Sequence, residues 1–409
     1  MRLLVTGGAG YIGSVVAGRL AAAGHDVTVA DDLSAGYART LPAGAALAKV
    51  SIHDIETVLM PGAGFDGVLH LAAKIAVGES MRHPEWYWHT NVTGSLALLD
   101  AVRTAGVPRL VFSSSAAVYG NPVAVPIPED AVVAPTSPYG WTKLAVDMAI
   151  GHECAAHGLG AVSLRYFNVA GAAYTADGRI LGERHQPETH LIPITLEVAA
   201  GRRDRLQIFG ADYPTTDGTC VRDYIHVEDL AAAHLLALDA AEPGRHRVYN
   251  LGNGNGFSNR QVADMVREVT GAPVPAEAAP RRPGDPAELV ASSARARGEL
   301  GWAPVKPGLH DIVADAWAFI RSRDDSDLAG GYPCSARRTA GSTALPASGS
   351  WCRRTAPHGH GRGRWKGTPP NGGQVTIPPA TYAREMRGRA VHARRSTAPP
   401  SSSTTTSPR

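Results

Sequence analysis

The first 31 residues constrain the fold of this chain more than any other stretch. An apolar run at residues 2–6 predicts a strand, and the glycine-rich residues 7–13 predict a tight loop. A helical pattern over residues 15–23 and a second apolar run at residues 27–30 follow, and this run ends in Asp31. Strand, glycine loop, helix, strand and acid stand here in the order of a dinucleotide-binding unit.

The chemistry of this unit favours NAD as the ligand. Glycines let backbone N–H groups approach a pyrophosphate at the N-terminus of the helix. A carboxylate at the end of the second strand can bind a ribose diol and would repel a 2′-phosphate, so Asp31 favours NAD over NADP. A glycine-rich turn without a ligand is the alternative, and it explains a lone glycine motif better than it explains this ordered set.

Further strands are predicted at residues 67–71, 110–113 and 161–165, with helical patterns between them. Strands that alternate with helices predict an α/β fold with a doubly wound parallel sheet, in which ligands bind at the carboxyl ends of the strands. His70 lies inside an apolar run, so we expect a buried, hydrogen-bonded histidine of the core rather than a catalytic one.

Ser115, Tyr139 and Lys143 are the candidate catalytic residues. Ser137 can cap a helix that starts with Pro138, which places Tyr139 and Lys143 four residues apart on one helix face. A lysine ammonium beside a phenol should lower its pKa, so that Tyr139 could exchange a proton with a sugar hydroxyl. Ser115 follows a predicted strand, where a hydroxyl can hydrogen-bond a reacting C–O group. A chance pair on a solvated helix face and a serine-rich turn are the alternatives, and the dinucleotide unit earlier in the chain disfavours both.

The spacing G-x-x-G-x-x-G and the pair Tyr139-x-x-x-Lys143 resemble the extended branch of the short-chain dehydrogenase/reductase superfamily. Over about residues 1–322 the chain is similar, more narrowly, to the UDP-glucose 4-epimerase family among the NAD-dependent epimerases and dehydratases. The most particular stretch is Asp212-Tyr213-Pro214 followed by Val-Arg-Asp-Tyr-Ile-His-Val at residues 221–227. The other matching stretches are residues 7–13, 77–80, 113–120, 139–143, 165–168 and 281–285.

The resemblance implies an isomerase of galactose metabolism. Such an enzyme interconverts UDP-galactose and UDP-glucose through a transient 4-keto intermediate with tightly bound NAD. By the same resemblance, Tyr139 takes the proton of the sugar 4-hydroxyl and Ser115 hydrogen-bonds the C4 oxygen. Lys143 lowers the pKa of the tyrosine and holds the nicotinamide ribose. A homodimer is also implied, formed by helices at residues 91–104 and 139–157.

The resemblance also assigns residues to the two ligands. Arg222 and Arg282 match arginines that bind the diphosphate, and Asp285 matches an acid that binds the uridine ribose. Asn91 either caps a helix or, as the resemblance implies, lies close to NAD. The residues implied for NAD are Gly7, Gly10, Tyr11, Ile12, Gly13, Asp31, Asp32, Leu33, Ser34, Gly36, Ser51, Ile52, Leu71, Ala72, Ala73, Asn91, Ser113, Tyr139, Lys143, Tyr166 and Phe167. The residues implied for the UDP-sugar are Ser115, Tyr139, Asn168, His190, Leu191, Gln207, Ile208, Phe209, Arg222, Arg282, Asp285 and Leu289.

Two domains and a tail are expected. Residues 1–171 with about 223–250 would form the NAD-binding domain, and about 172–222 with 251–323 would form a smaller mixed α/β domain for the UDP-sugar. Residues 324–409 are rich in Gly, Pro, Ser, Thr and Arg, and are expected to be a disordered basic tail or an out-of-frame extension. The net charge of +3 comes from this tail, so it gives no reason to expect a nucleic-acid partner for the folded part.

Neither a metal site nor a membrane segment is expected. Cys154, Cys220, Cys334 and Cys352 show no metal-ligand pairing and no disulfide pattern. No apolar run is long enough to cross a bilayer, and the apolar N-terminal residues fit a strand better than a signal peptide. We therefore expect a cytoplasmic protein without a membrane partner.

Other functions stay open at this point. A UDP-N-acetylglucosamine 4-epimerase would differ in the space at sugar C2, where the resemblance places Leu289, a side chain of intermediate size. A 4,6-dehydratase would carry an acid pair beside the catalytic strand, where this chain has Ala116 and Ala117. A decarboxylase of the same branch is a further alternative. A non-catalytic NAD-binding regulator would not need to keep the three catalytic candidates together.

Overall fold

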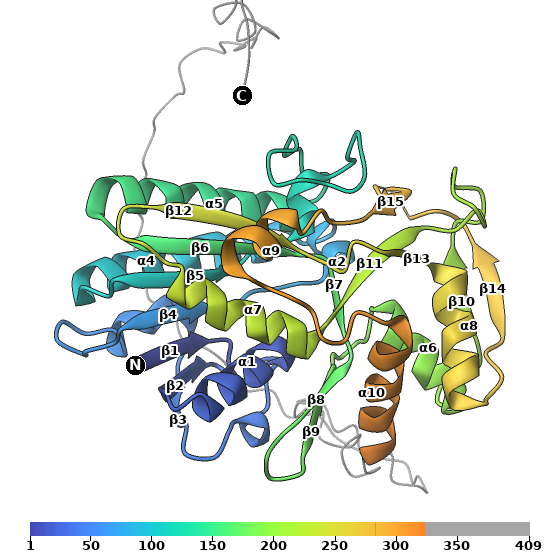
Figure 1. Cartoon of the computed structure of the whole chain (residues 1–409), viewed down its shortest axis with the longest axis horizontal. Helices are drawn as coiled ribbons and strands as arrows, with labels where there is room; N and C mark the ends of the chain where they lie inside the picture. Colours follow the sequence, from blue (N-terminus) through green and yellow to red (C-terminus); the bar gives the residue numbers. More distant parts are fainter. Residues whose placement is uncertain (283, 324–409) are drawn as a thin grey trace, which may run out of the picture. The chain divides into compact units, whose positions relative to one another are not determined.

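Seven parallel strands form the main sheet of the computed structural model, which describes residues 1–282 and 284–323 (Figure 1). The expected tail, residues 324–409, lies outside the described residues. The strand order is β12-β6-β5-β4-β1-β2-β3, and each neighbouring pair is parallel. The strands are β1 (Arg2–Thr6), β2 (Asp26–Asp31), β3 (Ala46–Lys49), β4 (Gly67–His70), β5 (Arg109–Ser113), β6 (Gly160–Tyr166) and β12 (His246–Leu251). This order confirms the doubly wound parallel sheet expected from the sequence.

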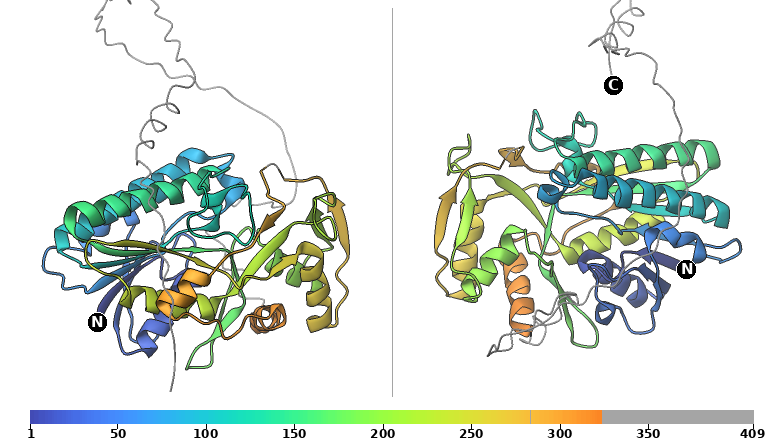
Figure 2. Two further views of the ribbon diagram at one scale, coloured as in Figure 1. Left: turned by 45° about the horizontal axis from the view of Figure 1, so that its top comes forward. Right: turned by 180° about the vertical axis from the view of Figure 1, so that it is seen from behind.

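Different helices cover the two faces of the sheet, because successive side chains of a strand point to opposite faces. In β1, Leu3 and Val5 join a buried cluster with residues of the helices on one face, whereas Leu4 joins a cluster with residues of the helices on the other. The covering helices are α1 (Tyr11–Ala22) and α7 (Val227–Asp239) on one face, and α4 (Gly94–Ala105) and α5 (Pro138–His157) on the other (Figures 1 and 2). Both faces are therefore buried, as a parallel sheet requires.

A second group of elements, built around β11 (Val221–His226), lies beside the main sheet (Figure 1). Strand β11 pairs in parallel with β7 (Asn168–Ala170) and β15 (Glu288–Leu289), and antiparallel with β13 (Gly256–Ser258). Two further pairs are β8 (Ala172–Tyr174) with β9 (Ile180–Gly182), and β10 (Leu206–Phe209) with β14 (Ala276–Ala279). The helices α6 (Leu191–Ala199), α8 (Asn259–Thr270) and α10 (Leu309–Ser322) contribute to one apolar cluster. Since all these residues belong to one compact unit with the main sheet, the predicted division into two domains stays a prediction.

The local details agree with the sequence-based expectations in some places and differ in others. The predicted cap is confirmed, because the Ser137 hydroxyl accepts a hydrogen bond from the N–H of Gly140. Asn91 is not a cap, because α4 continues directly from a π-helical segment that contains it. Strand β3 was not predicted, since it is a short and mostly exposed edge strand without β-branched or aromatic residues. The remaining elements are η1 (Ala38–Thr40), η2 (Ile52–Thr57), α2 (Val77–Ser80), α3 (Pro84–Tyr87), η3 (Trp88–Thr93), η4 (Ala116–Tyr119) and α9 (Ala294–Leu300).

Residues 1–282 and 284–323 contain no helix that could span a membrane. None of the helices there combines the length and the apolar character that a membrane crossing needs.

Close backbone contacts leave no room for a side chain at two glycines of the loop at residues 7–13. Gly7 has a φ of +70°, and a Cβ at this position would lie 2.6 Å from the backbone nitrogen of Ala72, just after β4. Gly13 lies in the first turn of α1, where a Cβ would overlap the carbonyl oxygen of Gly7. The loop, the helix and the end of β4 are therefore packed more closely than a side chain at either position would allow.

Replacement of Gly13 by alanine should therefore disturb the loop. We expect Gly13→Ala to lower the free energy of unfolding by about 1–3 kcal/mol, as overpacking does, and to reduce the NAD that copurifies with the protein. Gly18→Ala is a matched control in the same helix, because a Cβ there meets no atom within 4 Å. This control should raise the free energy of unfolding by about 0.5–1 kcal/mol. Urea denaturation and cofactor release measure the two effects, and equal behaviour of both variants would contradict the argument.

Candidate active site

A large cleft opens at the carboxyl ends of the main strands. Its volume is about 2530 Å³, whereas sites for one small molecule measure roughly 300–1,000 Å³. Residues of the glycine loop line it at one end, and residues of β10, β11 and β15 line it at the other. The cleft is thus large enough for two nucleotide-sized ligands, and it lies where an open parallel sheet places its ligands.

The glycine-loop end has the donors and acceptors that suit NAD. The N–H groups of Ala9 and Leu33 donate to the two carboxylate oxygens of Asp31, at 2.9 and 2.8 Å. These bonds fix the carboxylate at the end of β2, where each oxygen retains a lone pair for a ribose hydroxyl. Burial raises the pKa of Asp31, and the two backbone hydrogen bonds oppose this shift. Because Gly10 stands at the N-cap of α1 and has no side chain, the first N–H groups of the helix face no capping group. Glycines, acid and helix end together fit NAD.

Ser115, Tyr139 and Lys143 meet in the middle of the cleft. Lys143 is 3% exposed, and its Nζ donates to the carbonyl oxygen of Ser113 at the end of β5, 2.8 Å away. Tyr139 lies one turn earlier in α5, and its ring packs edge-on against Tyr87. The Ser115 side chain hydrogen-bonds the Tyr139 side chain and also accepts the N–H of Ala117, at 3.1 Å.

The protonation behaviour of this group differs from the expectation in one respect. We expected Lys143 to lower the pKa of Tyr139, but burial raises the pKa of this tyrosine, and only the hydrogen bond with Ser115 opposes the shift. The reason is that the Lys143 ammonium is bonded to the Ser113 carbonyl rather than to the phenol. Burial also lowers the pKa of Lys143 to about 8, while the nearby carboxylate of Asp147 opposes this shift.

Buried polar side chains surround Lys143 on the side away from the cleft and form hydrogen bonds with one another. Asp147, one turn after Lys143 in α5, accepts hydrogen bonds from Ser114 at 3.0 Å and from Arg165 at 3.1 Å. His70 is buried between two hydroxyls, with Thr6 Oγ1 2.7 Å from Nδ1 and Ser95 Oγ 2.8 Å from Nε2. This confirms the predicted core histidine. Burial, and secondly the charge of Lys143, lower the pKa of His70 to about 3, so the imidazole is neutral.

Strand β11 brings together residues of the other end of the cleft. Its register places Arg222 opposite Leu289 of β15, and Tyr224 opposite Asn168 of β7. Arg222 lies 3.7 Å from a carboxylate oxygen of Asp285. The guanidinium of Arg282 stacks on the Phe209 ring, with 4.0 Å between Cζ and the ring centre. Two arginines, an acid and an aromatic ring thus face the same cleft from three separate parts of the chain.

The cleft gathers all of the predicted NAD and UDP-sugar residues except Ser51, Asn91 and Ile208. Ser51 caps η2, because its hydroxyl accepts the N–H of His53. Ile208 lies in the apolar core, because its neighbours in β10, Gln207 and Phe209, point to the opposite side. Asn91 lies behind the cleft wall, where its amide bonds both backbone groups of Lys74 and the hydroxyl of Thr142. Asn91 therefore positions a segment that lines the cleft.

Three residues of a four-residue cluster in the cleft wall were missed in the sequence. Glu183, His185, Glu188 and His190 lie close together there, although only His190 was predicted to line the site. Their spacing E-x-H-x-x-E-x-H places four ion-binding side chains within eight residues, and this pattern could have drawn attention to them.

Comparisons with known proteins agree with this geometry. A family model for the NAD dependent epimerase/dehydratase family matches residues 3–252. A UDP-glucose 4-epimerase of Corynebacterium glutamicum is 55% identical over 325 residues, which make up 80% of this chain and 97% of that protein. One of Streptomyces lividans is 56% identical over 324 residues, or 78% of this chain and 96% of that protein. Among solved structures, the UDP-glucose 4-epimerase of Brucella ovis in complex with NAD has a TM-score of 0.73 and 42% identity, covering 78% of this chain and 98% of that one.

The neutral state of His70 predicts a dependence of stability on pH. In the unfolded chain this histidine has its ordinary pKa of 6.5, whereas the native pKa is about 3. Between these values the unfolded state binds a proton that the native state does not, so native stability falls as the pH falls. The slope from His70 should approach about 1.4 kcal/mol per pH unit.

Urea denaturation between pH 6.5 and 4.5 measures this contribution. We expect a smaller slope in His70→Gln, which cannot titrate, and an unchanged slope in His310→Gln, whose side chain is 61% exposed. If His70→Gln and the unchanged protein lost stability at the same rate, His70 would not be a buried neutral group.

Proposed function

The chain belongs to the NAD-dependent epimerase/dehydratase family, and we propose that within this family it interconverts UDP-galactose and UDP-glucose. The observation that carries the proposal is the place of Ser115, Tyr139 and Lys143, between an end of the cleft that suits NAD and an end with two arginines. An enzyme that epimerises a nucleotide-linked sugar needs both ends, with a proton-transfer group between them.

The UDP part of the substrate would be held by the residues around β11. Arg222 and Arg282 would bind the diphosphate, because guanidinium groups offer paired donors to phosphate oxygens. Asp285 would accept hydrogen bonds from the uridine ribose, and the Phe209 ring would lie against uracil. Asn168, which β7 places beside Tyr224, would bond the oxygen that links the diphosphate to the sugar.

The catalytic part is assigned to the three residues at the centre. Tyr139 takes the proton of the 4-hydroxyl and returns it in the second half of the reaction. Ser115 hydrogen-bonds the C4 oxygen and the phenol, so that both stay aligned. Lys143, one helical turn from Tyr139, would hold the nicotinamide ribose of bound NAD. When bound, NAD supplies reversible hydride transfer at C4 and a positive charge, so that the sugar passes through a transient 4-keto form.

The competing functions fit the site less well. A 4,6-dehydratase needs an acid and a base beside the catalytic strand, and this chain has the apolar Ala116 and Ala117 at the start of η4. A non-catalytic regulator would not need a buried lysine beside a tyrosine and a serine in the same cleft. The two relatives described above, each more than 50% identical to this chain, are UDP-glucose 4-epimerases, which also favours the first proposal.

We further propose that two copies of the chain pair through α4 and α5. These helices pack side by side on one face of the sheet (Figures 1 and 2). They expose large apolar side chains: Leu96 of α4 is 48% exposed, and Trp141 and Met148 of α5 are 48% and 59% exposed. Trp141 and Met148 stand seven residues apart, or two turns, on one side of the helix. A partner of the same kind would cover this patch in a symmetric contact. A cytoplasmic location is proposed as well, as expected from the sequence.

Replacement of Tyr139 by phenylalanine tests the catalytic assignment. We expect Tyr139→Phe to lose about 10²–10⁴ of the rate at which UDP-galactose becomes UDP-glucose, because the proton acceptor is removed. The variant should retain its NAD, since the ring stays in place. Tyr174→Phe, at an exposed tyrosine, should keep the full rate.

Turnover should be followed without added oxidant or reductant, with both UDP-hexoses and both N-acetylated forms. Undiminished activity of Tyr139→Phe would refute the assignment of the proton acceptor. Turnover of the N-acetylated substrates alone would instead point to the UDP-N-acetylglucosamine 4-epimerase alternative.

A charge in the patch on α5 should separate the two subunits. We expect Met148→Glu to run as a monomer in size-exclusion chromatography with light scattering, whereas the unchanged chain runs as a dimer, because a buried unpaired carboxylate is costly. Met60→Glu is a matched control, since Met60 is 58% exposed and lies outside both helices. A dimer that survives Met148→Glu would place the contact elsewhere.

A further inference from the structure

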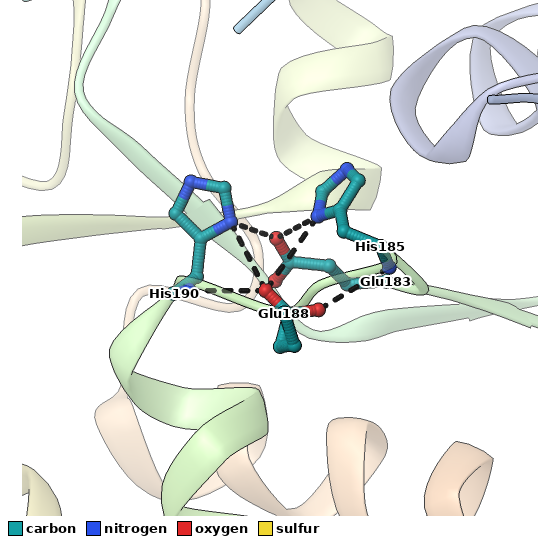
Figure 3. Close-up of side chains that lie close together, drawn as sticks. All are labelled: Glu183, His185, Glu188 and His190. Carbon is teal, nitrogen blue, oxygen red and sulfur yellow. Dashed lines mark hydrogen bonds and ion pairs between the residues drawn. The ribbon is translucent and has the colours of Figure 1, made fainter. Parts of the chain in front are cut away.

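The loop between β9 and α6 gathers two imidazoles and two carboxylates around one point (Figure 3). Nδ1 of His190 lies 2.5 Å from Oε1 of Glu183 and 3.5 Å from Oε1 of Glu188. Nδ1 of His185 lies 3.2 and 3.6 Å from the same two oxygens. One donor atom from each residue falls within 4.8 Å of all the others. The four side chains thus present their ligand atoms to a common centre.

The two imidazole nitrogens at this centre are buried and have no well-formed hydrogen bond. The side chains of Glu183 and Glu188 are 7% and 4% exposed. Nδ1 of His185 and Nδ1 of His190 are shielded from solvent, and the ring geometry gives neither of them a hydrogen-bond partner. Two carboxylates so deeply buried need positive charge nearby. Protons on both imidazoles could supply it, but so could a single cation at the common centre.

The distances are compatible with a metal ion. In a tetrahedral zinc site, ligand bonds of about 2.0–2.2 Å place neighbouring donor atoms roughly 3.3 Å apart. The four separations between nitrogen and oxygen range from 2.5 to 3.6 Å, and the other two separations are within 4.8 Å, so side-chain movements would be needed to bring all four atoms to tetrahedral distances. We propose that Glu183, His185, Glu188 and His190 bind one divalent transition-metal ion, and that Zn²⁺ matches this mixed nitrogen and oxygen set best.

Backbone hydrogen bonds hold one of the ligands in place before an ion binds. The N–H groups of Thr189 and His190 donate to Oε1 of Glu188, at 2.8 and 3.0 Å, and the N–H of His185 donates to Oε2 at 3.3 Å. Such support around a ligand fixes its direction and strengthens metal binding. Because two of these bonds occupy both lone pairs of Oε1, an ion would bind Glu188 by displacing one of them or through Oε2, so this carboxylate would be the weakest of the four ligands.

The ion would brace a wall of the cleft. The four residues line the same cleft as Tyr139, and His190 directly precedes Leu191, the first residue of α6. An ion held by residues 183–190 would tie the end of β9 to the start of α6. The proton transfer assigned to Tyr139 does not require this ion, so the inference stands apart from the proposed function.

Metal analysis of the full chain tests the proposal. The protein, produced without a histidine tag, is stripped with a chelator, given one equivalent of Zn²⁺ and passed through a desalting column. Elemental analysis should then find one zinc per chain. With Co²⁺ in place of Zn²⁺, the visible absorption of a four-coordinate cobalt site should appear. A chain that retains neither ion would overturn the proposal.

Variants locate the ion. Glu183→Gln and His185→Gln should each weaken Zn²⁺ binding by more than about tenfold in competition with a chromophoric chelator, since outer-shell changes alone cost 10–100-fold. His157→Gln is a matched control, because His157 is an exposed histidine whose nearest acidic partner is Glu153, 4.0 Å away, and not a residue of the cluster. This variant should leave the affinity for Zn²⁺ unchanged. Zn²⁺ should raise the midpoint of thermal unfolding of the unchanged chain and of His157→Gln only.

Two outcomes would overturn the assignment even if zinc binds. One is full affinity in both Glu183→Gln and His185→Gln. The other is loss of the ion in His358→Gln and His360→Gln, which would move the site to the histidine pair of the tail. Should one cluster variant fail to fold, as circular dichroism would show, Glu188→Gln provides the same test with the expected smaller loss.

Discussion

The rest of the molecule depends on the close contact between the glycine loop and the end of β4. Strands β1 and β4 are neighbours in the sheet, but the chain leaves them in opposite directions, and ligands bind at such a switch point. The chain can pass there only because Gly7 has a positive φ and no side chain, since a Cβ would meet the backbone at Ala72. Helix α1 then starts just beyond the carboxyl end of β1. From this arrangement follows the position of the cleft, with Asp31 on one side and α5 on the other.

A buried lysine at the centre of the site requires neighbours that satisfy its charge. Lys143 has little contact with water, so burial alone would favour its neutral form. The Ser113 carbonyl accepts its hydrogen bond, and Asp147 opposes the fall in its pKa. Asp147 is in turn paired with Arg165 of β6, 3.1 Å away, and both side chains are buried. The ammonium is thus stabilised by a chain of polar contacts that joins α5, β5 and β6. Replacement of Asp147 or Arg165 by an apolar residue would leave a buried charge without its partner.

The sequence predicted most of what depends on local order. Spacing of four residues placed Tyr139 and Lys143 on one helix face, and a strand end placed Ser115 near them. The direction of the Tyr139 pKa shift was wrong, because it depends on which oxygen the lysine reaches after the chain has folded. Ile208 was assigned to the cleft together with its neighbours, although the alternation within β10 turns it into the core. Short motifs identify segments, and only the register of the strand decides which of their side chains face a ligand.

The end of the cleft proposed for UDP shows what this register achieves. Arg222 and Tyr224 point to the same side of β11, so one strand aligns Leu289 of β15 and Asn168 of β7 along the cleft. Asp223 points to the opposite side, where its carboxylate accepts the N–H groups of Asn253, Gly254 and Ala291. Burial raises the pKa of Asp223 to about 6, and the three backbone hydrogen bonds oppose this shift. Side chains on a strand anchored in this way can hold a diphosphate at a fixed place. An epimerase needs such a fixed nucleotide, because the sugar has to present both of its faces while the nucleotide stays bound.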